Sequence, residues 1–171
     1  MKDRVFRFAF LGFAAAVMLT SGPAADAAQP APQPVTLECA TDMSIQVLGN
    51  AAPASAEGQS LVLVRAYFGV GGGIGAHTHP GTLIVAVESG SFGVTLEDEG
   101  MEMTVMRASD DAATPAVPEP LVAGQETVLE PGDWFIETGM AHSARNAGDE
   151  EAVVTFTGLV EAGQPVTSCV G

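Results

Sequence analysis

The sequence contains few basic residues. Six Lys and Arg stand against 21 Asp and Glu, which gives a formal net charge of −15 at pH 7. After the first few residues, the basic residues are Arg65, Arg107 and Arg145. A chain with this charge repels phosphate backbones and anionic lipid surfaces. The composition therefore excludes nucleic acid as a partner, and membranes as a partner of the mature chain.

Long apolar runs are also missing. The run at residues 8–19 is shorter than the roughly 18 to 20 residues needed to cross a bilayer. It follows Lys2, Arg4 and Arg7 and precedes the small residues 24–28, a layout typical of a secretory signal peptide. We expect residues 1–27 to be a signal peptide, with a membrane anchor as the alternative, and the mature protein to be secreted or periplasmic. Residues 28–34 are Ala, Gln and Pro, a composition that predicts a flexible tether.

Cysteine occurs only twice, at Cys39 and Cys169. Neither residue lies in a Cys-x-x-Cys motif or beside a histidine, which argues against a thiolate metal site. In an exported protein the pair predicts a disulfide between the start and the end of the mature chain, with two free thiols as the alternative. Because the bond would close a long loop, the chain-entropy model gives it a stabilising effect of at most ~4–5 kcal/mol.

Helical periodicity is absent from the sequence after residue 28. Instead, short runs rich in Val, Thr, Phe and Ile alternate with Gly, Pro, Asp and Asn. The expected strands are residues 35–37, 45–48, 61–70, 76–79, 83–87, 92–96, 101–106, 127–129, 134–136, 142–145 and 152–159. This pattern predicts a single all-β domain over residues 35–171, built as a sandwich or barrel, for which the jelly roll is one solution.

Two segments interrupt the pattern of strands. The glycine run 71–73 is expected to be a loop that lets the backbone bend into the next strand, because no helix follows it as in a phosphate-binding loop. Residues 109–120 contain three prolines and show no periodicity. This segment is expected to be a loop, either a surface excursion or a lid over the mouth of a barrel.

The three histidines of the chain are concentrated in two of the expected strands. His77 and His79 are two residues apart, so on a strand both rings leave the same face, and His142 lies in a second glycine-containing segment. A lone histidine is more often a hydrogen-bonded core residue than a ligand. Two imidazoles from one strand and a third from a facing strand would, however, bind a divalent ion and leave coordination positions open.

Glycines frame both histidine segments. The spaced residues are Gly71, His77, His79 and Gly90 in the first segment, and Gly132, Gly139, His142 and Asn146 in the second. In this order they resemble the two motifs of the cupin superfamily, over about residues 61–159. The first motif lacks its glutamate, because Leu83 or Ile84 occupies the carboxylate position. In the second motif, Glu137 stands roughly where a proline is expected.

The resemblance implies a cupin-like double-stranded β-helix, or jelly-roll barrel, with His77, His79 and His142 as ligands of one divalent transition metal ion (Fe, Zn, Mn, Ni or Cu). Three neutral ligands leave the charge of the ion uncompensated, which favours an anionic or chelating small-molecule ligand. The set resembles that of three-histidine cupins, which include thiol and diketone-cleaving dioxygenases. Cupins often pair through sheet edges, which makes a homodimer compatible with the resemblance.

Two functions therefore remain open. The first is a metal-dependent oxidoreductase, dioxygenase-like if the ion is iron, and the second is a noncatalytic module that binds a small molecule or metal. Arg65 and Tyr67 share one face of their expected strand and are candidates for substrate contacts, as is Glu137 near the metal. Surface ion pairing of Arg65 and structural packing of Tyr67 are the alternatives. A cavity mouth lined only by apolar residues would favour binding over catalysis.

Overall fold

The computed structural model describes residues 30–109, 111 and 113–171, so the expected signal peptide lies outside the described residues. The described chain is all-β, as the sequence predicts. Its strands are β1 (Gln33–Pro34), β2 (Ala40–Ala51), β3 (Gln59–Thr78), β4 (Gly81–Ser89), β5 (Phe92–Leu96), β6 (Thr104–Arg107), β7 (Val117–Pro120), β8 (Glu126–Leu129), β9 (Trp134–Glu137), β10 (His142–Asn146), β11 (Ala152–Glu161) and β12 (Ser168–Cys169). In this part of the chain no helix has the length and apolarity needed to span a bilayer.

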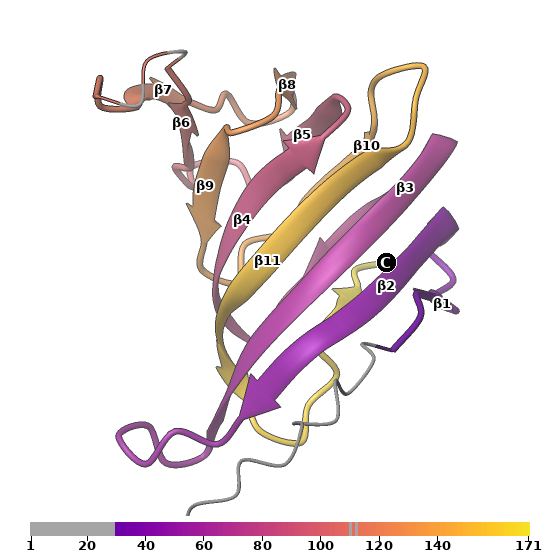
Figure 1. Ribbon diagram of the computed structural model, residues 1–171, viewed down its shortest axis with the longest axis vertical. Helices are drawn as coiled ribbons and strands as arrows, with labels where there is room; N and C mark the ends of the chain where they lie inside the picture. The colour runs from indigo at the N-terminus through magenta and orange to yellow at the C-terminus, as the bar shows by residue number, and fades with distance from the viewer. Residues whose placement is uncertain (1–29, 110, 112) are drawn as a thin grey trace, which may run out of the picture.

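The strands form one antiparallel sheet that curls around an apolar interior (Figure 1). The order along the sheet is β7-β6-β9-β4-β11-β3-β10-β5-β8, and β2 adds to the other side of β3. The 20-residue strand β3 is the centre of this arrangement, since it pairs with β2, β10, β11 and β12. This curled antiparallel sheet confirms the predicted jelly-roll class.

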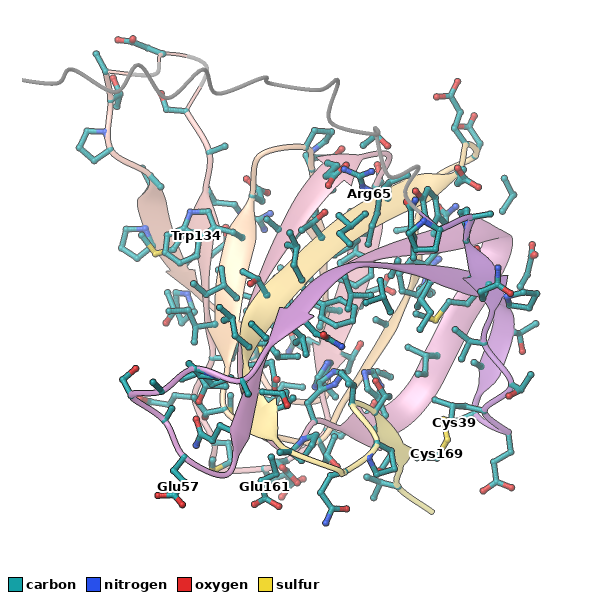
Figure 2. All side chains as sticks on the ribbon, turned by 60° about the horizontal axis from the view of Figure 1, so that its bottom comes forward. Cys39, Glu57, Arg65, Trp134, Glu161 and Cys169 are labelled. Carbon is teal, nitrogen blue, oxygen red and sulfur yellow. A yellow bond between two sulfur atoms is a disulfide. The ribbon has the colours of Figure 1, made fainter. Side chains whose placement is uncertain are left out.

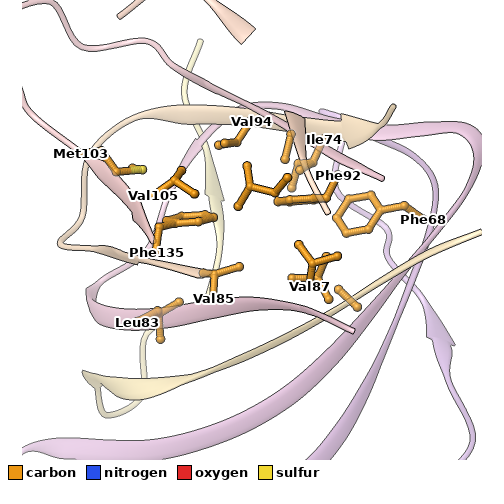
Figure 3. Packing of buried hydrophobic residues seen from close by; sticks show 14 of the residues in the cluster. Phe68, Ile74, Leu83, Val85, Val87, Phe92, Val94, Met103, Val105 and Phe135 are labelled. Carbon is orange, nitrogen blue, oxygen red and sulfur yellow. The ribbon is translucent and has the colours of Figure 1, made fainter. Parts of the chain in front are cut away.

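Alternation along β3 shows how the sequence selects the interior face. Val62, Val64, Ala66 and Phe68 are buried, whereas the residues between them are exposed or half-buried. Because successive side chains of a strand point to opposite faces, this alternation buries one apolar row of β3. Figure 3 shows Phe68 and Phe92 together with buried valines from several strands in the resulting core.

The glycine run 71–73 does not form the expected loop. It lies within β3, so the two strands predicted at 61–70 and 76–79 are one continuous element. The strand bends there: Gly71 has a φ of +78°, and the neighbouring residue Asp42 of β2 has a φ of +43° where the pairing register shifts. Glycine permits both the backbone angle and the close approach to Asp42, so the run acts as a bend within a strand.

The segment 109–120 is only partly the expected loop. Its last four residues, Val117–Pro120, form β7, which pairs with β6 at the edge of the sheet. Proline is compatible with this position because an edge strand has backbone groups that need no ladder partner. Figure 1 shows β6 and β7 at the end of the sheet far from β2 and β3.

The start of the folded chain also differs from the expectation. Residues 35–37 are not in a strand, and the preceding residues Gln33–Pro34 form β1, paired with Ser44 and Ile45 of β2. These two residues belong to the segment predicted as a tether. The side-chain amide of Gln46 also donates a hydrogen bond to the carbonyl of Pro30, so contacts with the sheet begin before residue 35.

The predicted disulfide is present. Cys39 and Cys169 are bonded with a Cα–Cα distance of 6.0 Å, and Figure 2 shows the bond joining the segment before β2 to the C-terminal strand. Strand β12, which contains Cys169, pairs with Thr78 and His77 at the end of β3. The bond is consistent with an oxidising compartment, and it fixes the C-terminal segment beside the histidines.

Candidate metal centre

The structure brings the three histidines together at one end of β3. His142 begins β10 and is the direct pairing partner of His77 on β3, while His79 follows the last residue of β3. The ring centroids are 4.3 Å apart for His77 and His142, 5.0 Å for His77 and His79, and 5.4 Å for His79 and His142. One nitrogen from each ring lies within 4.8 Å of the others. The three residues therefore form a cluster whose nitrogens could hold one ion.

Backbone carbonyls fix the orientation and tautomer of each ring. Nδ1 of His77 lies 2.9 Å from the carbonyl oxygen of Gly75, and Nδ1 of His142 lies 3.0 Å from that of Met140. Nδ1 of His79 lies 2.7 Å from the carbonyl oxygen of Val166. Because a carbonyl oxygen can only accept, each Nδ1 carries the proton and each Nε2 keeps a free lone pair. Hydrogen bonds of this kind on the remote nitrogen are typical of metal-ligating histidines.

Burial keeps the three imidazoles neutral. Desolvation lowers the pKa of His77 to about 3, with a smaller contribution from the neighbouring His142. It also lowers the pKa of His79 to about 4 and moves the pKa of His142 in the same direction. Neutral imidazoles are the form that binds metals. The donor set fits a divalent first-row transition ion, and Fe, Zn, Mn, Ni and Cu are all compatible with imidazole ligands.

The histidines line an interior cavity of about 300 Å³. Apart from the three rings, its polar lining consists of Thr167, whose hydroxyl oxygen lies 3.3 Å from Nδ1 of His79. The remaining lining residues are Val35, Leu37, Met43, Ile45, Val47, Val64, Ala66, Phe68, Ile74, Leu83, Val85, Phe92, Phe135, Ala144, Val154, Phe156 and Val166. None of the described residues of the 109–120 segment is among them, so the cavity walls give no support to the lid.

Arg65 and Tyr67 do not reach the histidines. Both alternate with the buried residues of β3 and lie on its outer face. The Arg65 guanidinium makes an ion pair with Glu88 at 2.9 Å, and the Tyr67 hydroxyl donates a hydrogen bond to the Gln46 side chain at 2.8 Å. Neither residue lines the histidine cavity, so the structure gives their candidate role at the substrate no support. The alternatives, a surface ion pair and structural packing, describe both residues.

Glu137 is buried but does not line the cavity. It is the last residue of β9, pairs with Leu83 of β4 and has an exposed fraction of 0%. Its Oε2 accepts a hydrogen bond from the backbone N–H of Gly139, whereas Oε1 is buried without a hydrogen-bond partner. Desolvation raises the pKa of this carboxyl to about 7. Through its hydrogen bond with Gly139, the residue positions the turn before His142.

Sequence reasoning missed the C-terminal part of the site. Val166 supplies the carbonyl for His79, and Thr167 lines the cavity, although both lie far from the histidines in sequence. A backbone carbonyl acceptor leaves no signature in the identity of its residue. The one available signal was the predicted disulfide, which places the residues just before Cys169 close to the start of the domain.

Neither a protein-family model nor a curated protein sequence matches the chain. Solved structures with a similar arrangement include the polyketide cyclase RemF from Streptomyces resistomycificus, with 16% identity, coverage of 82% of this chain and 80% of that chain, and a TM-score of 0.46. A cupin-like protein from Thermotoga maritima has 16% identity, 75% and 76% coverage and a TM-score of 0.46. KdgF from Halomonas sp. has 19% identity, 75% and 87% coverage and a TM-score of 0.46.

The chain's own geometry meets the expectations that the motif resemblance sets. The first motif supplies His77 and His79 at the end of β3, and the second supplies His142 on the strand paired with it. Asn146, at the end of the second motif, is buried and donates hydrogen bonds to the carbonyls of Phe68 and Glu150, which fixes the end of β10. The described chain is a cupin-like, all-β jelly-roll fold with a three-histidine cluster suited to a metal ion.

Proposed function

We propose that this protein holds one divalent transition metal ion through His77, His79 and His142 and presents it to a small chelating molecule in the cavity. The observation that carries the proposal is the set of three Nδ1 contacts to backbone carbonyls, which leaves three neighbouring Nε2 atoms free. With three protein ligands, a bound ion would offer Lewis acidity and open coordination positions to a small molecule.

Of the two functional classes, noncatalytic binding has the stronger support. No carboxylate, lysine or arginine lines the cavity, so the described residues offer no general acid or base beside the histidines. The buried carboxyl of Glu137 lies outside the lining, and Arg65 is paired on the outer face. A protein that captures a metal-chelating small molecule needs neither group.

Oxidation by dioxygen is the second candidate. It is favoured by the number of protein ligands, because three histidines leave room for both dioxygen and a chelating substrate on a bound iron ion. Oxygen consumption by iron-loaded protein, measured with thiol, diketone and phenolic compounds, separates the two candidates. Turnover of any of them would establish an enzyme, and binding without oxygen uptake would establish a binding protein.

The metal centre itself is tested by metal analysis of the purified full chain. We expect one equivalent of a divalent ion in the wild type and an affinity at least about tenfold weaker in His77→Ala and His142→Ala, because each change removes one ligand. Thr78→Ala is the matched control, since Thr78 lies between the two ligands of the first motif. Histidine variants that bind metal as tightly as the wild type would contradict the proposal.

We further propose that residues 1–27 are a signal peptide and that the folded domain, which includes Gln33–Pro34 of the expected tether, works outside the cytoplasm. The Cys39–Cys169 bond supports this proposal because disulfides persist in oxidising compartments. The intact mass of protein recovered from outside the cytoplasm provides the test. A mass that includes the first 27 residues would contradict cleavage.

A further inference from the structure

We infer that the ligand of this centre carries a single metal-chelating group on an otherwise uncharged, apolar body. The inference rests on the proposed metal centre and narrows the class of molecule that it takes. The three-histidine set alone allows two classes, small polyanions and apolar chelators. The walls of the cavity and the positions of the arginines distinguish between them.

The cavity offers one polar end and an apolar remainder. Its polar side chains are the three histidines and Thr167, and Thr167 itself lies beside His79. All other lining residues are aliphatic or aromatic. A ligand that fills the cavity can therefore place polar atoms only at the histidine end. A polar group elsewhere would lose its water without gaining a hydrogen bond, which is unfavourable.

No arginine of the described chain is available to a second charge on the ligand. Arg65 is paired with Glu88, Arg107 with Glu119 and Asp133, and Arg145 with Glu126. None of the three lines the cavity. A carboxylate or phosphate remote from the metal would therefore be buried without a counterion, which is strongly unfavourable. The acidic net charge of the chain opposes such a group further.

The shape of the apolar part favours a compact ring or branched chain. The cavity volume of about 300 Å³ is at the lower end of the ~300–1,000 Å³ typical of ligand sites. Phenylalanines contribute to the walls. The ring centroids of Phe68 and Phe92 are 5.3 Å apart, and the ring centroid of Phe156 lies 6.1 Å from that of His79. Figure 3 shows Phe68, Phe92 and Phe135 around the interior. Aromatic ligands would pack against these rings.

Hydroxamates that share one chelating head and differ in the body test this inference. The probes are acetohydroxamate, benzohydroxamate, para-nitrobenzohydroxamate and para-carboxybenzohydroxamate, added to cobalt-loaded full chain and followed by the visible spectrum of the cobalt ion. The nitro and carboxylate probes have similar shapes and differ in charge. We expect benzohydroxamate to bind at least about tenfold more tightly than acetohydroxamate, and the nitro probe at least about tenfold more tightly than the carboxylate probe. Equal or tighter binding of the carboxylate probe would overturn the inference.

A variant that introduces a cation into the wall provides a second test. Val47 lines the cavity and is 44% exposed, so Val47→Arg can place a guanidinium at the wall without filling the core. Ile84→Arg is the matched control, because Ile84 is also 44% exposed but does not line the cavity. We expect Val47→Arg to lower the nitro-to-carboxylate affinity ratio at least about fivefold and Ile84→Arg to leave it unchanged. Equal effects of the two variants would contradict the inference.

Cobalt stoichiometry, measured on each protein, tests the metal centre separately from the class of ligand. Failure of the wild type to take up cobalt would overturn the proposed metal centre and the inference with it. Cobalt uptake combined with a preference for the carboxylate probe would overturn the inference alone and leave the metal centre in place.

Discussion

At the scale of single residues, Glu137 is a carboxyl group whose burial has a large expected cost. Its side chain is fully buried, one oxygen accepts a single backbone hydrogen bond, and the other has no partner. No arginine or lysine contributes to its pKa, which desolvation raises to about 7. A carboxyl in these surroundings is more stable in the neutral form, so folding becomes linked to protonation at this position.

The pKa of Glu137 predicts that stability falls as pH rises. Between pH 4.5, the ordinary value, and about 7, the folded chain keeps a proton that the unfolded chain has lost. The contribution is therefore fully present below pH 4.5 and is lost as pH rises to about 7, by ~3 kcal/mol. Glu137→Gln removes this dependence, so we expect the variant to exceed the wild type in free energy of unfolding at pH 8 and to match it near pH 4.5.

Urea unfolding at several pH values measures this effect. Glu161→Gln is the matched control, because Glu161 lies at an exposed position at the end of β11. The control should keep the pH dependence of the wild type. A Glu137→Gln variant that is less stable than the wild type at pH 8 would show that the ionised carboxylate stabilises the fold, contrary to the expectation.

The identities of the three histidines could be predicted from the sequence, but their surroundings could not. The i, i+2 spacing of His77 and His79 defines a shared face on a strand, and the glycine framing of His142 indicates a second motif. The direction of Glu137 and the outward orientation of Arg65 depend on where each strand enters the sheet. A spacing rule fixes which residues share a face of one strand, but it does not fix which face points inward.

At the scale of elements, the bend in β3 controls where the histidines lie. Strand β3 passes close to the bulge of β2 at Asp42, and a Cβ placed on Gly72 would lie 2.3 Å from the Asp42 carbonyl oxygen. The residues after this bend include His77. Sequence patterns indicate glycine-rich runs as loops because glycine lacks strand propensity. They cannot show that a neighbouring backbone approaches closely enough to require glycine within a strand.

Gly72→Ala is expected to destabilise the fold, because the clash is with backbone atoms that cannot rotate away. We expect a loss of ~1–3 kcal/mol in the free energy of unfolding, in the range of overpacked sites. Gly49→Ala in β2 is the control, since a Cβ there meets nothing within 4 Å. Urea denaturation of both variants provides the measurement. A Gly72→Ala protein as stable as Gly49→Ala would show that the β2–β3 contact is looser than the structure shows.

Strand β7, which pairs with β6, lies in a segment that the sequence pattern predicts to be a loop. Pro118 and Pro120 lie in β7 opposite Met106 and Thr104. Prolines within a short segment favour a loop when each position is considered alone. An edge strand has one side free of ladder hydrogen bonds, so it accepts proline there. Only the sheet order identifies β7 as an edge strand among the described strands.

At the scale of the whole molecule, the disulfide links the two ends of the domain to the three-histidine cluster. Cys169 pairs with His77 across β12 and β3, and the carbonyl of Cys39 accepts a hydrogen bond from the backbone N–H of Gly75. The same C-terminal segment carries Val166, whose carbonyl holds the Nδ1 proton of His79. The covalent bond therefore secures both the segment and the orientation of one proposed ligand.

This connection predicts that loss of the disulfide weakens metal binding as well as stability. In Cys39→Ser/Cys169→Ser, the free energy of unfolding should fall by up to ~4–5 kcal/mol in the chain-entropy model. Since His79 would lose its fixed carbonyl partner whenever the C-terminal segment detaches, zinc affinity should fall about tenfold, as for other outer partners of metal ligands. Competition with a chromophoric chelator measures the affinity, and circular dichroism confirms that the variant is folded under the conditions used.

Reduction of the wild type supplies the corresponding reversible test. Reduced protein should bind zinc as weakly as the double variant, and reoxidised protein should recover the original affinity, because only the Cys39–Cys169 bond changes. Among the described residues there are no other cysteines that could respond to the reductant. A folded, reduced protein with unchanged zinc affinity would contradict this prediction. In that case, hydrogen bonds alone would keep β12 and the Val166 contact in place. The disulfide would then stabilise the fold without acting on the proposed metal centre.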